Sequence, residues 1–155
     1  EYTPISRQSA DRDFRRLTTA EMAACVANKD QHGNLEIGGL SALDGVIERA
    51  IIGCANPAEN IGAGKMSWRH RFHVRHLSLQ PSVEIPLHIR YEEEVIIVQQ
   101  GELLVDIDGY TTTLFPGDVF TAPIHQPRRY LSQTQQPVEA FIVRRGNHPL
   151  AAKFV

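Results

Sequence analysis

The most informative stretch of the sequence reads PLHIRYEEEVIIVQQG and covers residues 86–101. Its second half combines Val and Ile, whose branched side chains favour β-strands. Gly101 closes the stretch with a residue type that is common in tight turns. The pattern therefore predicts a β-strand over residues 91–100, followed by a turn.

The polar side chains of this stretch can be sorted by strand alternation. Successive side chains of a strand point to opposite faces, so His88 and Arg90 share one face. By the same rule Glu93 lies opposite Glu94 and is expected at the surface. A run of three glutamates is by itself typical of a solvated face, so an inward position of Glu94 needs support from a wider pattern.

Further strands are predicted on both sides of this stretch. Asp108–Gly109 is a strong two-residue hairpin signal, and residues 116–118 form another turn. Short strands separated by turns about every 8–12 residues are typical of a β-sandwich or barrel. The predicted strands are residues 45–53, 66–80, 91–100, 102–106, 110–114, 119–122, 128–132 and 138–144. For residues 45–53 a short helix is the alternative.

The first part of the chain has a different pattern. Thr18 and Glu21 form a capping box, which predicts a helix over residues 19–28. Residues 56–64 contain one Pro and two Gly and are expected to form a loop. We therefore predict a helical and irregular N-terminal extension over residues 1–64 that packs on the barrel or on a neighbour, a β-barrel over residues 65–148, and a C-terminal tail over residues 149–155.

The composition is typical of a soluble globular domain. The chain has 155 residues, of which 42% are hydrophobic and 22% charged. A formal net charge of -2 offers no basic excess for a nucleic acid or an acidic membrane, so neither partner is expected. Cys25 and Cys54 fit no CxxC pattern and are expected to be reduced, in a cytoplasmic protein. The sequence contains neither a G-x-S-x-G nucleophile elbow nor a phosphate-binding Gly-rich loop.

Two segments resemble the sequence motifs of the cupin family. The first cupin motif, G-x5-H-x-H-x3–4-E-x6-G, is matched by His88, Glu94 and Gly101. The second motif, G-x5-P-x-G-x2-H-x3-N, is matched by Gly117 and Pro123. The resemblance implies an all-β fold, the cupin-type double-stranded β-helix or jelly-roll barrel, and an inward position for Glu94.

Five positions depart from these motifs. Arg90 stands at the second His of the first motif, and Arg128 stands at the His of the second motif. Ser82 replaces the leading Gly, His125 replaces a Gly of the second motif, and Ser132 replaces its final Asn. In metal-binding cupins the motif histidines and the Glu hold one divalent transition metal. A guanidinium group stays protonated and cannot bind a metal, so no cofactor is favoured here.

The arginine substitutions indicate an anion site instead. If His88 enters the barrel, Arg90 enters with it, and the resemblance brings Glu94 and Arg128 to the same place. Arg75 is expected to join them, because it alternates in phase with two leucines that are expected to point inward. Guanidinium groups bind carboxylates with two parallel hydrogen bonds. The alternative is that the arginines pair with Glu94 and fill the barrel as a buried salt bridge.

The first functional hypothesis is a metal-independent cupin that binds a small anionic organic molecule in its barrel. Isomerase, cyclase or lyase chemistry is the candidate activity, with His88 or Glu94 as general acid or base. Arg75, Arg90, Arg128 and His125 are the expected ligand-binding residues. The sequence leaves open whether the chain is an enzyme.

Two alternatives remain. One is a metal-dependent cupin dioxygenase in which His88, Glu94 and His125 bind Fe, Mn, Zn, Ni or Cu. The other is a non-catalytic ligand sensor, or the degenerate half of a two-barrel cupin. The resemblance also implies a homodimer.

The run WRHRFHVRH, residues 68–76, is unusually rich in cationic side chains. On a strand, His70 and His73 point to opposite faces and cannot form one metal site together. We therefore expect a cationic strip on a pocket wall or a subunit interface.

Overall fold

The computed structural model describes residues 43–52, 71–146, 150 and 152–155. Within these ranges the chain is all-β and forms ten strands. The strands are β1 (Val46–Ile52), β2 (Phe72–Leu79), β3 (Glu84–Ile89), β4 (Glu94–Gln100), β5 (Leu103–Ile107), β6 (Tyr110–Leu114), β7 (Val119–Ala122), β8 (Arg128–Ser132), β9 (Val138–Arg145) and β10 (Lys153–Phe154).

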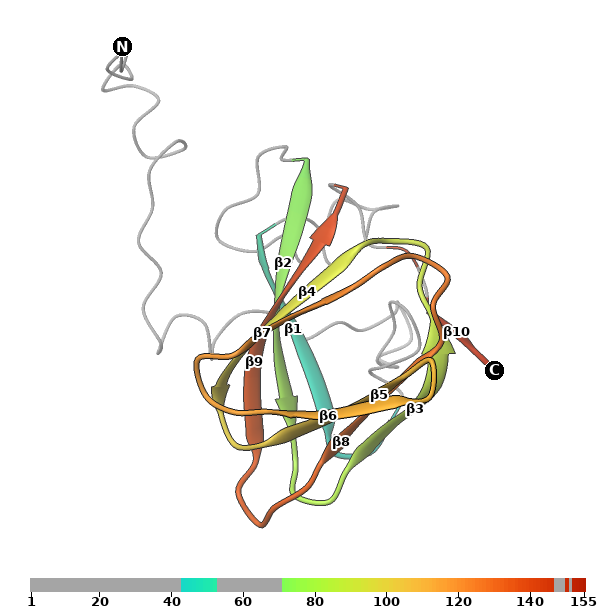
Figure 1. The fold of residues 1–155 in the computed structure, drawn as a ribbon. Helices are drawn as coiled ribbons and strands as arrows, with labels where there is room; N and C mark the ends of the chain where they lie inside the picture. The colour runs from blue at the N-terminus through green and yellow to red at the C-terminus, as the bar shows by residue number, and fades with distance from the viewer. Residues whose placement is uncertain (1–42, 53–70, 147–149, 151) are drawn as a thin grey trace, which may run out of the picture.

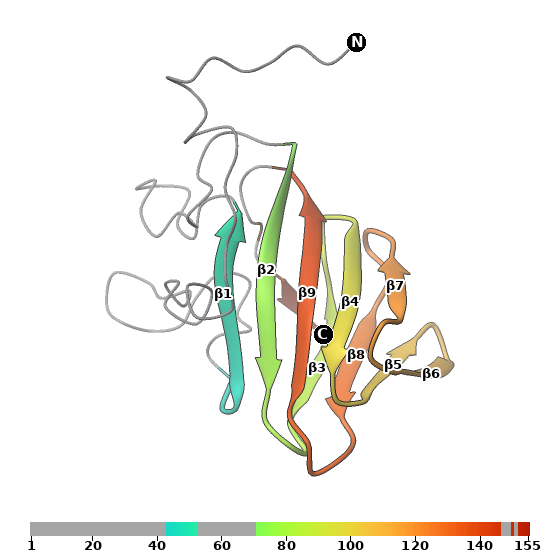
Figure 2. The same ribbon diagram turned by 90° about the vertical axis from the view of Figure 1, so that its left-hand side faces the viewer.

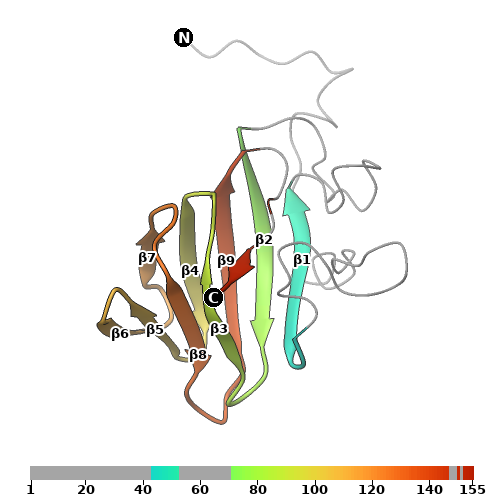
Figure 3. The same cartoon turned by 90° about the vertical axis from the view of Figure 1, so that its right-hand side faces the viewer.

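The strands form two five-stranded antiparallel sheets. The order is β1-β2-β9-β4-β7 in one sheet and β10-β3-β8-β5-β6 in the other (Figure 1). Figure 2 shows the first sheet with β1, β2, β9 and β4 side by side, and Figure 3 shows the molecule from the opposite side. Neighbouring strands come from distant parts of the chain, as in a jelly roll. The predicted all-β jelly-roll fold is confirmed.

The strand predictions agree with the structure in most places. Strands β6, β7 and β8 have the predicted bounds, and β1 lies inside the strand predicted over residues 45–53. The strand predicted over residues 91–100 was wrong at its start, because the chain bends before β4 begins at Glu94. There the carbonyl oxygen of Arg90 accepts a hydrogen bond from the backbone N–H of His125 instead of joining the ladder.

Strands β3 and β10 were not predicted as strands. Pro86 lies inside β3 and has no N–H group to donate, and the β3–β8 register shifts between Ile85 and His88. Strand β10 has only two residues, too few to give a pattern. Several expectations lie outside the described residues: the helix over residues 19–28, the loop over residues 56–64, Cys25, Cys54 and His70.

Tight turns connect several strands at glycines. Asp108 and Gly109 have φ angles of 52° and 71°, the positive values of a two-residue hairpin, and join β5 to β6. Gly101 has a φ of 78°, and a Cβ atom placed there would lie 2.5 Å from the carbonyl oxygen of Pro137. The closing Gly of the first motif is therefore required by both conformation and space.

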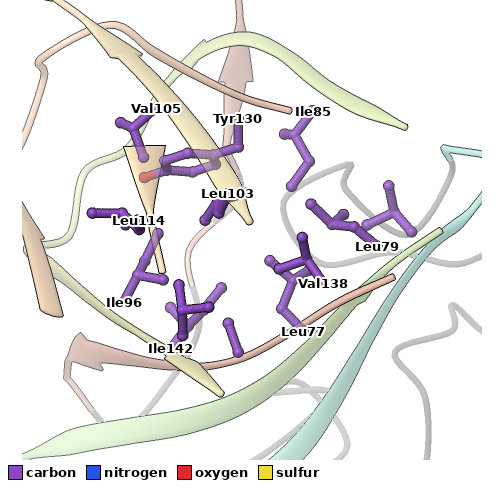
Figure 4. Packing of buried hydrophobic residues seen from close by; sticks show 13 residues of the cluster. Leu77, Leu79, Ile85, Ile96, Leu103, Val105, Leu114, Tyr130, Val138 and Ile142 are labelled. Atoms are coloured by element: carbon purple, nitrogen blue, oxygen red, sulfur yellow. The ribbon is translucent and has the colours of Figure 1, made fainter. Parts of the chain in front are cut away.

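The barrel interior is apolar along one part of its length. Strand β2 shows the division, with Leu77 and Leu79 in the apolar part and His73 and Arg75 outside it. The two sheets contribute side chains that pack against each other between them (Figure 4). The apolar cluster consists of Val46, Leu77, Leu79, Ile85, Ile96, Val98, Leu103, Val105, Leu114, Tyr130, Val138, Ala140 and Ile142.

Among the described residues, the structure contains no helix that is long and apolar enough to cross a membrane.

Candidate functional site

The remaining part of the barrel interior is filled by charged and titratable side chains. Each of them is at most 3% exposed, which is unusual for arginine and glutamate. Burial of this many charges is tolerable only when the groups pair with one another. The residues are Glu48, His73, Arg75, His88, Arg90, Glu92, Glu94, Arg128 and Arg144.

The strand register explains why these residues meet. Arg144 on β9 is the partner of His73 on β2 and of Glu94 on β4. The three residues therefore form a row across three neighbouring strands. In the facing sheet, His88 on β3 is the partner of Arg128 on β8. These residues lie at or near the ends of their strands.

Glu94 is the centre of the charged cluster. Its Oε1 accepts a hydrogen bond from the Tyr130 hydroxyl at 2.5 Å and lies 3.6 Å from Nη1 of Arg128. Its Oε2 accepts one from Nε of Arg144 at 2.8 Å and lies 3.2 Å from Nε of Arg90. Burial alone would raise the pKa of Glu94, but the surrounding guanidinium groups and the tyrosine hold it well below its usual range. Glu94 is therefore a fixed carboxylate at neutral pH.

Two further glutamates continue the network on either side. Nη1 of Arg144 donates to Oε1 of Glu48 at 2.5 Å, and Nη1 of Arg90 donates to Oε1 of Glu92 at 3.3 Å. Burial alone would raise the pKa of Glu48, but Arg144 and its neighbours keep it below its ordinary value. Burial lowers the pKa of Arg75 to about 10, and the nearby Arg144 acts in the same direction.

His88 is neutral and carries an open acceptor. Its Nδ1 donates a hydrogen bond to the carbonyl oxygen of Pro86 at 2.8 Å, which places the ring proton on that nitrogen. Burial lowers the pKa of His88 to about 4. Its Nε2 is buried and has no hydrogen-bond partner among the residues that the structure describes. The ring packs against Tyr130 and Phe154, with centroids 5.7 Å away in both cases.

The second-motif residues are placed differently. Arg128 donates from Nε to the carbonyl oxygen of Gln126 at 3.0 Å and from Nη2 to that of Pro123 at 2.5 Å. Its Nη1 lies 3.6 Å from Oε1 of Glu94 and has no hydrogen-bond partner among the described residues. His125 is exposed, and its ring packs against Tyr91 with centroids 5.3 Å apart.

The described residues do not fit a transition-metal site. Both oxygens of Glu94 are held by guanidinium groups and Tyr130, and two of the family's ligand positions are Arg90 and Arg128. The buried lone pair of His88 Nε2 is one suitable donor, but His125 lies at the surface. Within the described parts of the chain, no three His, Cys, Asp or Glu side chains are grouped so that they could hold a metal ion.

Sequence reasoning placed five of its candidate residues correctly in the interior and missed five others. His88, Glu94, Arg75, Arg90 and Arg128 are all buried, and Glu93 is exposed as expected. Alternation along the strands could have found Glu48 and Arg144, because they share a face with the inward residues Val46 and Ile142. The missed residues are Glu48, His73, Glu92, Tyr130 and Arg144.

Comparison with known proteins shows what the barrel is similar to. Residues 75–144 match the family described as Cupin domain. No curated protein is significantly similar to the sequence. Among solved structures, the fold resembles the DMSP lyase DddQ from Ruegeria pomeroyi DSS-3, with a TM-score of 0.64 and 17% identity. That alignment covers 86% of this chain and 62% of the lyase chain, so the chain spans less than two thirds of the lyase.

Two other solved structures show the same fold. The polyketide cyclase RemF from Streptomyces resistomycificus has a TM-score of 0.63 and 17% identity over 92% of this chain and 85% of its own. An oxalate oxidase has a TM-score of 0.57 and 20% identity over 77% of this chain and 60% of its own. Identities this low show the fold alone. The family match over residues 75–144 and these solved structures agree that the barrel has the cupin fold.

Proposed function

We propose that the barrel binds a small organic anion at the guanidinium groups of Arg90 and Arg144. Both groups contact the same oxygen of Glu94 through Nε, so they lie next to each other. The observation that carries the proposal is that Nη2 of each is buried and has no hydrogen-bond partner among the described residues. Guanidinium N–H donors suit the oxygens of a carboxylate.

The charge of the buried cluster supports the same ligand class. The cluster contains four arginines and three glutamates, and burial lowers the pKa of its two histidines to about 3 for His73 and about 4 for His88. Buried charge without a counter-charge is costly, so an anion is a favourable addition to this set. A carboxylate ligand offsets the excess positive charge of the cluster, and this binding needs no metal ion.

His88 supplies the base in this proposal. Its Nε2 lone pair is buried in the barrel interior, on the sheet that faces Arg144, while Glu94 is too well stabilised as a carboxylate to exchange a proton at neutral pH. Isomerase, cyclase or lyase chemistry on a bound carboxylic acid fits this arrangement. The proposed chemistry needs no metal. The predicted homodimer and cytoplasmic location stay predictions.

The test is binding of small carboxylates, measured as a rise in melting temperature and by calorimetry. Acetate, oxalate and phenylacetate are suitable probes, because these carboxylates differ from one another in length and in apolar character. We expect Arg90→Lys and Arg144→Lys, which keep the charge but remove Nη2, to weaken binding at least about tenfold, which is roughly 1.4 kcal/mol. Arg129→Lys is the matched control, because Arg129 lies at the surface beside Asp106.

Two outcomes would count against the proposal. Failure of all three probes to stabilise the protein would remove the anion site. Near-stoichiometric transition metal in the same preparations, lost in His88→Ala, would favour the metal-dependent alternative.

A further inference from the structure

Two strands of the first sheet carry apolar side chains on both of their faces. Residues 95–98 of β4 read VIIV, and residues 140–143 of β9 read AFIV. A strand with one solvated face alternates apolar and polar residues, whereas an uninterrupted apolar run is typical of a strand that is covered on both faces. Ile96 and Ile142 belong to the apolar cluster of the interior. Alternation therefore places the following residues on the outer face of the sheet: Val95, Ile97, Phe141 and Val143.

The strand register aligns the outward apolar residues in two rows across the sheet. One row runs from β1 to β4, and the next row runs from β9 to β7. Neighbouring strands lie about 4.8 Å apart, so the side chains of one row are close enough to contact one another. The first row consists of Ile52, Val74, Val143 and Val95, and the second consists of Phe141, Ile97 and Val119. We call these seven residues the outer patch.

The outer patch is solvent-accessible and has a polar rim. Val119 is 59% exposed, and the other six side chains are half-buried. The patch is centred on β9, the middle strand of the five (Figure 2). Polar side chains border it on three sides, namely Arg49, His76, Ser78, Gln99, Thr121 and Glu139. An apolar centre within a polar rim is the usual arrangement of a protein–protein interface.

The outer face of the second sheet has a different composition. Arg129 on β8 lies 3.1 Å from Asp106 on β5 and 3.7 Å from Glu84 on β3, so ion pairs extend across this face. In the register, Asp106 is the partner of Thr111, and Leu104 is the partner of Thr113. Charged and hydroxyl side chains of this kind are typical of a solvated sheet face. The apolar rows are therefore a property of the first sheet and not of both outer faces.

We propose that the outer patch is the surface through which two copies of this chain associate, with their first sheets packed face to face. Two twisted sheets pack well on each other, and a second copy presents an apolar centre of the same width. The rim carries Arg49 and Glu139, charges of both signs, so it does not repel a copy of itself. This assignment rests on register and exposure and is independent of the proposed anion site.

The size of the face is sufficient for a specific dimer. Five strands spaced about 4.8 Å apart, each about six residues long, form a face of roughly 500 Å². Two such faces bury roughly 1,000 Å² in total, which reaches the lower limit for a specific interface. Loss of water from the apolar rows of both copies is the driving force that we expect.

Sedimentation velocity of the full chain over a wide range of protein concentration tests the proposal. We expect a dimer for the wild type. Ile97→Glu places a carboxylate beside the central strand of both copies, so the dimer dissociation constant should rise at least about a hundredfold. Leu104→Glu is the matched control, because Leu104 is also a half-buried outward residue within a strand, on the second sheet. It should leave the dissociation constant unchanged.

A second pair of variants decides the question if Ile97→Glu does not fold. Val119 and Tyr110 are 59% and 65% exposed and lie on edge strands of the first and second sheet, so the monomer tolerates a charge at either position. We expect Val119→Glu to weaken the dimer at least about tenfold and Tyr110→Glu to leave it unchanged. A wild type that is monomeric at every concentration would overturn the proposal. Equal dissociation constants within the folded pair would do the same.

Discussion

Glu94 shows how a residue can keep a motif position while its chemistry changes. In the motif this carboxylate belongs to a metal site, but here Arg144 and Arg90 bind one oxygen and Tyr130 and Arg128 contact the other. Each partner stabilises the charged form. Glu94 therefore holds the surrounding arginines in place as a permanent carboxylate. Proton exchange is left to other titratable groups of the barrel interior.

The substitution Glu94→Gln tests this role. It keeps the shape of the side chain but leaves several buried guanidinium groups without their shared anion. We expect the free energy of unfolding to fall by about 3–5 kcal/mol, as for other broken buried ion pairs. Urea unfolding measures the change, with Glu93→Gln expected within about 0.5 kcal/mol of the wild type. Equal stability of the two variants would show that the network contributes little.

Sequence reasoning could find the site residues that belong to a motif or that alternate in step with inward-pointing residues of a strand. His88, Arg90 and Glu94 follow from the first motif, and Arg75 follows from alternation with leucines. Glu92 lies in a run of acidic residues that is usually solvated, so its burial depends on His73 and Leu150, which are remote in sequence. Long-range pairing of this kind leaves no local pattern.

At the scale of elements, the residues of the turns were the best guide to where the strands begin and end. Asp108–Gly109 and residues 116–118 predicted the bounds of β6 and β7, and the bounds of β5 to within one residue, because few residues adopt such conformations. Strand β10 forms because it pairs with β3, where Phe154 is the partner of His88. A strand of two residues is defined by its neighbour and by nothing in its own sequence.

Gly101 and Gly109 form a natural pair for testing what a turn glycine contributes. Their φ angles are 78° and 71°, so alanine is strained by a similar amount at both positions. At Gly109 a Cβ atom would meet no heavy atom within 4 Å, whereas at Gly101 it would meet backbone atoms of residues 137 and 138. We expect Gly109→Ala to cost about 1 kcal/mol and Gly101→Ala to cost more, with the difference measured by urea unfolding. Equal costs would show that the backbone near Pro137 moves easily.

At the scale of the whole molecule, the interior combines an apolar cluster with a charged network. The apolar cluster is insensitive to pH, so the pH dependence of stability must come from the buried titratable groups. His88 and Glu94 have pKa values below their ordinary values because the folded state disfavours their protonated forms, and Glu92 is displaced in the opposite direction.

The sign of the effect can be worked out group by group. The folded protein binds a proton at His88 only below about pH 4, whereas the unfolded chain binds one below about pH 6.5. Between these values the unfolded state holds more protons, so stability falls as the pH is lowered, by up to about 3 kcal/mol from His88. Below about pH 4.5, protonation of Glu94 in the unfolded chain extends the loss, while the raised pKa of Glu92 opposes it.

Unfolding by urea between pH 7 and pH 4 measures this dependence. We expect His88→Asn, whose amide can still donate to the carbonyl oxygen of Pro86, to reduce the slope between pH 6.5 and pH 4. The slope that remains comes from His73, because burial lowers its pKa to about 3. His125→Asn should leave the slope unchanged, because His125 is exposed. If the wild type and His88→Asn lose stability in parallel, His88 is protonated in the folded barrel at mildly acidic pH, and the open acceptor on which its proposed role as a base depends is absent there.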